Sequence, residues 1–276
     1  MSEAKAIRDE VAQSYTKAVS GASCCSTSCC GAEPTSETAK AAGYDPADLA
    51  SLPADAVASS FGCGAPVAFA GIREGDTVLD LGSGAGIDLL LAAQKVGPAG
   101  KVIGVDMTDA MIERARANAA RAGATQVEVR KGIIEELPVA TESVDWVISN
   151  CVVNLSPEKD RVFREIARVL KPGGELSISD IVVEELPAAL RGNPALRAAC
   201  VAGAITEAEY LAGLRAAGLS EVRVEDRLVY DAAQIAGFLG GDELGELTRA
   251  LPAEVVRALP KALDGKVWSA RFRARR

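Results

Sequence analysis

Hydrophobic and polar positions follow a regular order between residues 77 and 181. Short runs rich in Val, Ile and Leu predict strands, and apolar residues recurring every three to four positions predict helices between most of them. The expected strands are Thr77–Leu81, Lys101–Asp106, Val127–Lys131, Val144–Asn150 and Glu175–Ile181, and the expected helices are Ile87–Val96, Asp109–Ala122 and Pro157–Leu170. This alternation predicts an α/β fold: a mostly parallel sheet with helices on both faces.

The pattern is looser on either side of this core. The expected outer elements are an amphipathic helix over Ala6–Val19, a short helix from Asp45-Pro46 to Pro53, a turn at Lys171–Gly174, helical segments over 195–218 and 231–263, and strands over Val222–Val229 and Val267–Phe272. We therefore divide the chain into residues 1–60, an N-terminal helix and cysteine-rich loop; 61–182, the core; and 183–276, a smaller C-terminal α+β region that completes the sheet.

The first expected core strand runs directly into Gly82-x-Gly84-x-Gly86 and a helix. Such a turn lets a ligand lie against backbone N–H groups. The spacing differs from the dinucleotide fingerprint, and Asp80 would repel a diphosphate. Asp80 suits an amino group, and Asp106 suits ribose hydroxyls, although the alternative is that it only caps the following turn. Together these features favour S-adenosylmethionine, which carries an amino acid and a ribose but no phosphate.

Composition excludes several classes of function. The chain has 276 residues, 49% of them hydrophobic, which is enough for a sizeable core. The net charge of −8 gives no basic footprint for nucleic acid, and we expect the basic end Arg271–Arg276 to be a solvated strand end. Apolar runs of membrane-spanning length are missing, and residues 1–5 alternate in charge. We expect a soluble, cytoplasmic protein without a nucleic-acid or membrane partner.

Histidine is absent, which removes the commonest general base and every histidine-containing zinc site. The seven cysteines are an odd number, so a static disulfide framework is a poor explanation for them. They are Cys24, Cys25, Cys29, Cys30, Cys63, Cys151 and Cys200. Metalloid or metal binding, redox cycling and simple burial remain as explanations.

The cysteines differ in how well burial explains them. Cys151 and Cys200, taken singly, resemble ordinary small buried hydrophobes. Cys63 lies between Gly62 and Gly64 and is poorly explained by packing. The four thiols of residues 24–30 suit redox or metalloid handling, with a soft metal site as the alternative.

Five motifs together carry a resemblance to a known family. They are Asp80–Gly86, Gly104–Thr108, Gly132–Glu135, Ser149–Leu155 and Arg168–Glu175. They resemble the arsenite S-adenosylmethionine methyltransferases, a family of the class I (Rossmann-like) methyltransferase fold. The first and last motifs occur in many class I methyltransferases. Ser149–Leu155 and Gly104–Thr108 are more specific to the arsenic family, and so is a further short motif, Phe61–Gly64. The similarity extends from about Val11 to about Gly203 and is closest to the short microbial form.

The resemblance implies a cofactor site made of Asp80, Gly82, Ser83, Gly84, Gly86, Asp106, Met107, Ile134, Glu135 and Asn150. In it the glycines line the methionine part of the cofactor, and Asp106 holds the ribose. Met107 packs on the adenine, Ile134 and Glu135 complete the adenine pocket, and Asn150 lies near the methionine end.

The resemblance also assigns roles to the cysteines. Cys63, Cys151 and Cys200 match three cysteines that bind trivalent arsenic, and Cys24, Cys25, Cys29 and Cys30 compete for the position of a fourth, redox-active one. Trivalent arsenic bound to three thiolates keeps a lone pair that attacks the sulfonium methyl without a histidine base. A further thiol returns the oxidised arsenic to the trivalent state, and a thioredoxin- or glutathione-type reductant resets the resulting disulfide.

We therefore expect methylation of arsenite or thiol-bound arsenicals. One alternative is a class I methyltransferase of a small organic molecule whose cysteines are only structural. Another is a protein that sequesters the metalloid without turnover. Two positions depart from the family pattern: Ala199 stands where a glutamate is frequent and Phe61 where a tyrosine is common.

Overall fold

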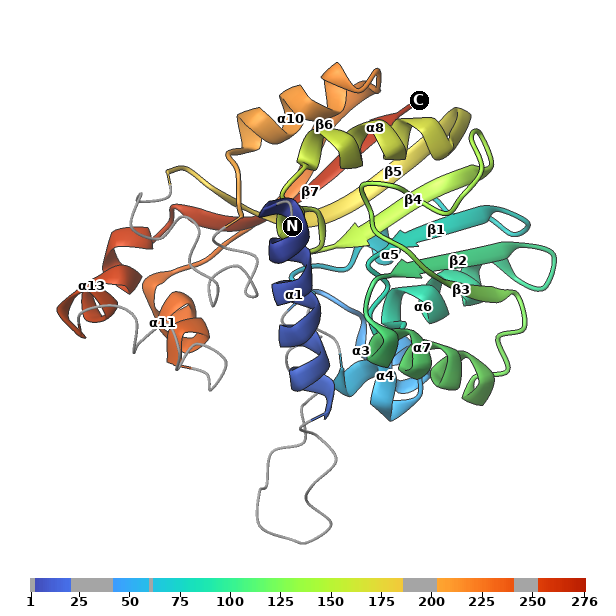
Figure 1. Cartoon of the computed structure of the whole chain (residues 1–276), viewed down its shortest axis with the longest axis horizontal. Coiled ribbons are helices and arrows are strands. Elements are labelled where there is room, and N and C mark those ends of the chain that lie inside the picture. The colour runs from blue at the N-terminus through green and yellow to red at the C-terminus, as the bar shows by residue number, and fades with distance from the viewer. Residues whose placement is uncertain (1–2, 21–41, 60–61, 186–202, 241–252) are drawn as a thin grey trace, which may run out of the picture.

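The computed structural model describes residues 3–20, 42–59, 62–185, 203–240 and 253–276. One seven-stranded sheet runs through these residues, in the order β3-β2-β1-β4-β5-β7-β6 (Figure 1). The strands are β1 Thr77–Leu81, β2 Lys101–Asp106, β3 Val127–Lys131, β4 Val144–Asn150, β5 Leu170–Val183, β6 Ser220–Val229 and β7 Val267–Arg275. The first four match the expected strands in both bounds.

Strands β1 to β5 pair in parallel, and β7 lies antiparallel between β5 and β6. The C-terminal part of the chain therefore completes the same sheet. Because β1 lies between β2 and β4, the chain reverses its direction of travel across the sheet there. In open α/β sheets, ligands bind outside the carboxyl ends of strands at such a point.

Helices cover both faces of the sheet, as the alternation of elements predicted. The described helices are α1 Glu3–Ser20, α3 Pro46–Ala50, α4 Ala54–Ala58, α5 Pro66–Phe69, α6 Ile87–Val96, α7 Asp109–Arg121, the 3-10 turn η2 Val153–Leu155, α8 Lys159–Val169, α10 Glu207–Ala216, α11 Ala232–Gly240 and α13 Ala253–Leu263. Apolar residues of α8 and α10 form one core with the sheet, and those of α3 to α7 form the other. Helices α11 and α13 lie beyond the strand ends, away from both layers (Figure 1).

Short sequence signals explain where several helices begin. The side chain of Asp45 accepts a hydrogen bond from the N–H of Ala47, and Pro46 opens α3, as its sequence predicted. At α10, Thr206 and Glu209 form a reciprocal capping box. The helix expected over 195–218 is thus confirmed only from Glu207, because residues 203–206 are not helical. Residues 186–202 lie outside the described part of the chain.

Two expectations about the strands are corrected. The turn expected at Lys171–Gly174 belongs instead to the irregular start of β5. Here the N–H of Gly173 donates to the carbonyl of Arg276, and the N–H of Arg276 donates to the carbonyl of Gly174. The chain end thus supplies backbone partners that the local sequence does not reveal.

The basic end is a strand, but it is not a solvated one throughout. The side chain of Arg273 is 12% exposed, lies 2.6 Å from a carboxylate oxygen of Glu175 and stacks over the ring of Trp146. Arg271 is 13% exposed and lies near two carboxylates of β6. Only Arg275 is half exposed. Because β7 pairs with β5 on one side and β6 on the other, the side chains of Arg271 and Arg273 are largely buried, whereas a strand at the edge of the sheet would expose them.

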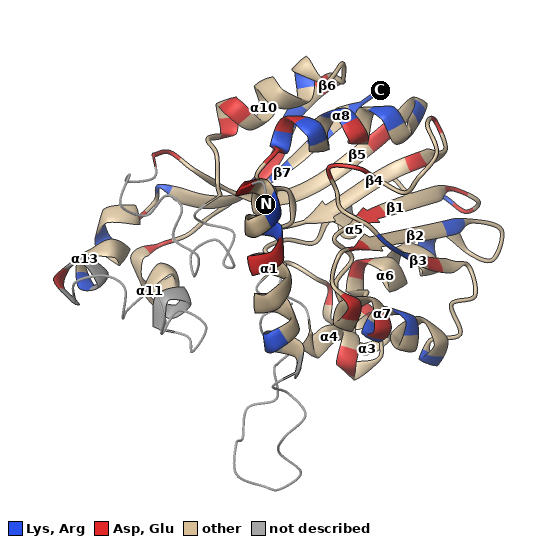
Figure 2. Ribbon diagram, viewed as in Figure 1, with Lys and Arg blue, Asp and Glu red and all other residues tan. Residues whose placement is uncertain are grey.

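Charged residues of both signs are interspersed over most of the described helices (Figure 2). No described helix is long and apolar enough to cross a membrane.

Candidate active site

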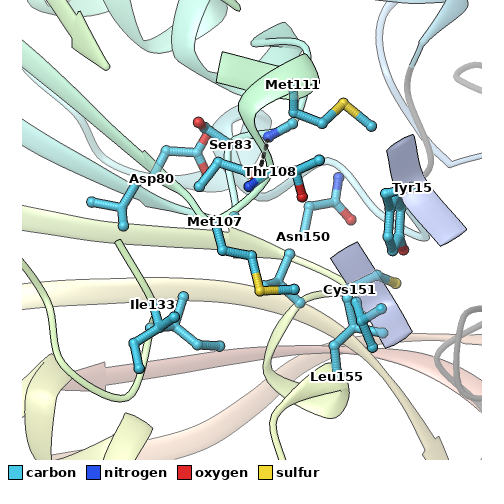
Figure 3. A pocket seen from close by; sticks show the side chains of 18 of the residues that line it. Tyr15, Asp80, Ser83, Met107, Thr108, Met111, Ile133, Asn150, Cys151 and Leu155 are labelled. Atoms are coloured by element: carbon cyan, nitrogen blue, oxygen red, sulfur yellow. Dashed lines mark hydrogen bonds between the residues drawn. The ribbon is translucent and has the colours of Figure 1, made fainter. Parts of the chain in front are cut away.

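A cavity of about 950 Å³, including space open to solvent, lies at the carboxyl ends of β1, β2 and β4. The strand-end loops supply its floor, and Arg8, Val11 and Tyr15 of α1 line it from the other side. Figure 3 shows side chains from these elements, Tyr15 and Met107 among them, around a common space. Nine of the ten predicted cofactor residues line this cavity: Asp80, Gly82, Ser83, Gly84, Asp106, Met107, Ile134, Glu135 and Asn150.

The glycine turn between β1 and α6 forms one wall. Gly82, Gly84 and Gly86 all have positive φ angles, of 63°, 50° and 97°, which L side chains rarely adopt. A Cβ on Gly82 would come within 2.5 Å of Val152, whereas one on Gly84 would meet no protein atom within 4 Å. Gly86 begins α6 as its N-cap instead of lining the cavity. The space beside Gly84 is thus left open for a ligand.

Asp106, at the end of β2, is the residue expected either to bind the ribose or only to cap the following turn. Its carboxylate accepts one hydrogen bond from the N–H of Gly84, at 3.0 Å, and one from the N–H of Thr108, at 2.8 Å. It therefore caps the following turn, yet it also lines the cavity. Burial raises its pKa, and these hydrogen bonds oppose the shift.

Two buried carboxylates form the end of the cavity beneath the glycine turn. Asp80 and Asp88 are 2% and 4% exposed. Burial raises the pKa of Asp88 to about 6, against hydrogen bonds from Tyr44 and Asn150. Burial and the neighbouring carboxylates of Asp88 and Asp106 raise the pKa of Asp80 well above its usual range. This end suits a cationic group, which would favour both ionised carboxylates.

Glu135, which is 3% exposed, also lines the cavity. Its carboxylate accepts the hydroxyl hydrogen of Ser156 at 2.7 Å and a guanidinium hydrogen of Arg8 at 3.2 Å. Arg8 also donates to Glu158 at 3.0 Å. Helix α1 is thereby fastened across the cavity through its only cavity-lining cation.

Cys151 lines the cavity directly after β4 and forms a disulfide with Cys63, with Cα atoms 5.9 Å apart. Cys151 has a φ of 59°, and its N–H donates to the carbonyl of Ser179. The structure thus brings together two of the three cysteines expected to bind arsenic, in their oxidised form.

The other predicted thiols are not placed. Cys200, Cys24, Cys25, Cys29 and Cys30 lie outside the described residues, so their roles stay predictions. Within the described ranges, His, Cys, Asp and Glu form no cluster of three or more suited to a metal ion.

Sequence reasoning missed three contributors to the site: Tyr44, Asp88 and the inner face of α1. Tyr44 is remote in sequence, but its hydroxyl donates to Asp88 at 2.8 Å. Asp88 stands two residues after Gly86, and this carboxylate at the start of a helix was the available signal. For α1, the apolar spacing predicted the helix but not what it covers.

Comparison with known proteins agrees with this geometry. Residues 72–218 match the family model described as a methyltransferase domain. The fold superposes, with a TM-score of 0.66, on the crystal structure of an arsenic(III) S-adenosylmethionine methyltransferase from Chlamydomonas reinhardtii, which is 34% identical over 82% of this chain and 71% of that one. This chain belongs to the arsenite S-adenosylmethionine methyltransferase family. The expected fold and family are thereby confirmed.

Curated relatives show the same kinship. An arsenite methyltransferase of Halobacterium salinarum is 48% identical over 228 residues, which are 79% of this chain and 58% of that protein. One of Aquipseudomonas alcaligenes is 44% identical over 180 residues, or 60% of this chain and 50% of that protein. The matched region thus spans between half and three fifths of the length of these relatives.

S-adenosylmethionine is the methyl donor of this family, and the cavity fits it. The buried hydroxyl of Ser83 and one carboxylate oxygen of Asp88 have no partner among the described residues. Both lie at the end where the donor's charged amino-acid group would bind. The open space beside Gly84 would admit the donor close to the backbone N–H groups.

Proposed function

We propose that this protein is an enzyme that transfers a methyl group from S-adenosylmethionine to trivalent arsenic. The observation that carries the proposal is the position of Cys151. It lines the cavity that fits the donor, and its sulfur is within bonding distance of the sulfur of Cys63. A thiophilic acceptor bound by this pair would lie at the edge of the donor cavity.

The residues that line the cavity would hold the donor. Asp80 and Asp88 would attract its ammonium group, and the turn at Gly84 would admit its amino-acid part. Asp106 would accept hydrogen bonds from the ribose, while Met107 and Ile134 would enclose the adenine. The bound donor supplies an electrophilic methyl group. The protein's task is then mainly to orient the acceptor toward it.

Arsenic binding requires the reduced form of the cysteine pair. The disulfide must take up two electrons and two protons to give two thiols, which then replace oxygen ligands of arsenite. Cys200 is the proposed third ligand. Arsenic held by sulfur keeps a lone pair as the nucleophile, so the absence of histidine is consistent with this chemistry.

The proposed cycle also uses a thiol of the N-terminal loop. Methyl transfer leaves arsenic in the pentavalent state, and two thiols return it to the trivalent state by giving up two electrons and forming a disulfide. One of Cys24, Cys25, Cys29 and Cys30 would take part. A thioredoxin- or glutathione-type reductant would then restore both thiols.

The test is product speciation after incubating the protein with arsenite, S-adenosylmethionine and a thiol reductant. Methylated arsenic is expected from the reduced wild type, and its loss is expected in Cys63→Ser and Cys151→Ser. Equal yields from these variants would refute arsenic binding by this pair. Tight arsenite binding without any methylated product would instead identify a sequestering protein.

A further inference from the structure

Two consecutive residues at the end of β4 hold Cys63 in different ways. Cys151 holds it through the disulfide between the side chains. Asn150 holds it through the backbone, because its side-chain oxygen accepts the N–H of Cys63 at 3.0 Å and the N–H of Gly64 at 3.1 Å. The second attachment does not depend on the oxidation state of the sulfurs.

Both polar atoms of the Asn150 amide form hydrogen bonds with the backbone of the loop that contains Cys63. The amide nitrogen donates to the carbonyl of Gly64 at 2.5 Å. The amide oxygen and nitrogen therefore engage two N–H groups and one C=O group of a two-residue segment. A side chain that is both donor and acceptor is needed for this pattern.

The glycines flanking Cys63 are explained by the same contact. A Cβ on Gly62 would overlap the Asn150 amide, and one on Gly64 would come within 2.5 Å of Ser179. The loop thus lies directly against the end of β4 and against Ser179 within β5. Ser177 of β5 adds a hydrogen bond to the carbonyl of Pro66, at 3.0 Å.

A buried network fixes which way the Asn150 amide faces. The Tyr44 hydroxyl donates its hydrogen to Asp88, so its oxygen accepts from the Asn150 nitrogen at 2.8 Å. The same nitrogen lies 3.2 Å from the Asp88 carboxylate. With its nitrogen facing these two acceptors, the amide can only turn its oxygen toward the two loop N–H groups.

We propose that Asn150 is a positioning residue that keeps Cys63 beside Cys151 after the disulfide opens. Without Asn150, the reduced loop could move away from the end of β4. The disulfide could then re-form only after the loop had returned. With Asn150, the reduced pair keeps a high effective concentration. In the reaction proposed above, which this inference extends, the docked pair would bind arsenic as a chelate.

The direct test is the disulfide equilibrium of Cys63 and Cys151 in glutathione buffers, without arsenic or donor. Two protein thiols pass two electrons and two protons to glutathione disulfide, which becomes two glutathione thiols. The full-length chain is used with its five other cysteines changed to serine, so that one internal disulfide is possible. Alkylation of free thiols and mass spectrometry give the oxidised fraction.

Asn150→Ala is expected to lower the equilibrium constant for the disulfide about tenfold, since several hydrogen bonds that dock the reduced loop are lost. Asn150→Asp keeps the acceptor oxygen but loses the donor, and is expected to lower it by about threefold. The matched control is Gln126→Ala, which removes a hydrogen bond from a side-chain amide to the backbone carbonyl of Ala93, at a site remote from the thiols. It should leave the constant unchanged.

An equilibrium constant equal to that of the wild type in Asn150→Ala would overturn the proposal. If that variant does not fold, equality in Asn150→Asp overturns it instead. Binding of phenylarsine oxide to the reduced protein, in which two thiols form two arsenic–sulfur bonds and release water, should weaken in parallel. A wild type that fails to methylate arsenite removes the proposed function but leaves the disulfide equilibrium as a separate test.

Discussion

At the scale of single residues, the cavity is lined by carboxylates whose pKa values are raised by burial. The side chain of Asp88 is buried, and this burial raises its pKa from the ordinary value of 3.8 to about 6. A group whose pKa rises on folding binds more protons in the folded than in the unfolded state. Its contribution to stability therefore falls as pH rises from about 4 to about 6.

This pH dependence gives the first prediction. Asp88→Asn keeps an oxygen that can accept from Tyr44 but has no charge to bury. The variant should gain stability relative to the wild type as pH rises from 4 to above 6, by about 3 kcal/mol at most. Urea unfolding of both proteins at several pH values measures the difference. A difference that stays constant across this window would contradict the assigned pKa.

Gly84 carries the second prediction. A Cβ there meets no protein atom within 4 Å, so Gly84→Ala costs the folded protein only the strain of a positive φ, about 1 kcal/mol. The added methyl group occupies the space left for the donor, and affinity for S-adenosylmethionine should fall at least about tenfold, roughly the 1–3 kcal/mol of an overpacked site.

The chain offers a matched control for this change. Gly123 has a φ of 66° and equally open surroundings, but it follows α7 and does not line the cavity. Gly123→Ala should show the same loss of stability with unchanged donor affinity by calorimetry. If both variants bound the donor equally well, the glycine turn would not be the donor's binding surface.

At the scale of elements, local signals predicted what local forces decide. Strands β1 to β4 and helix α6 agree with expectation at both ends, because buried apolar runs and flanking glycines determine them. The start of β5 was missed because its partners are remote in sequence: Leu170 pairs with Val144 of β4, and Gly173 and Gly174 form backbone hydrogen bonds with Arg276. Likewise the contact of Tyr44 with Asp88 joins residues 44 positions apart, which spacing alone cannot predict.

The same limit applies to the covering helix. The pattern over Ala6–Val19 predicted an amphipathic helix, and α1 confirms it. That its inner face closes a cavity depends on Arg8 meeting Glu135, more than a hundred residues away in sequence. The residues predicted to bind the cofactor lie at or near strand ends, a position that the sequence pattern indicates, whereas the covering residues follow no such rule.

Helix α1 gives the third prediction. Arg8→Ala removes the ion pairs to Glu135 and Glu158 that fasten α1 over the cavity. Donor dissociation should become about fivefold faster, as expected from the loss of roughly 1 kcal/mol of charged hydrogen bonding. Lys5→Ala is the control, since Lys5 pairs with Asp9 on the exposed side of the same helix. Equal dissociation rates in stopped-flow measurements of both variants would show that α1 does not retain the donor.

At the scale of the whole molecule, the disulfide joins two distant parts of the fold. It links the segment before the sheet to the end of the central strand β4, across a sequence separation of 88 residues. Such a link restricts the unfolded chain, so opening it should lower the free energy of unfolding by up to about 4 kcal/mol. Reduction therefore changes stability as well as chemistry.

The last prediction follows from that link. A reductant should lower the thermal midpoint of the wild type, and arsenite added to the reduced protein should raise it again, because arsenic bound to Cys63 and Cys151 closes the same loop. The oxidised protein offers no free thiol at this pair, so arsenite should not raise its midpoint through this site. In the control with both cysteines changed to serine, neither treatment should act through this pair. Recovery by arsenite in that control as large as in the wild type would place the arsenic elsewhere, and would separate the metalloid site from the donor cavity that Cys151 lines.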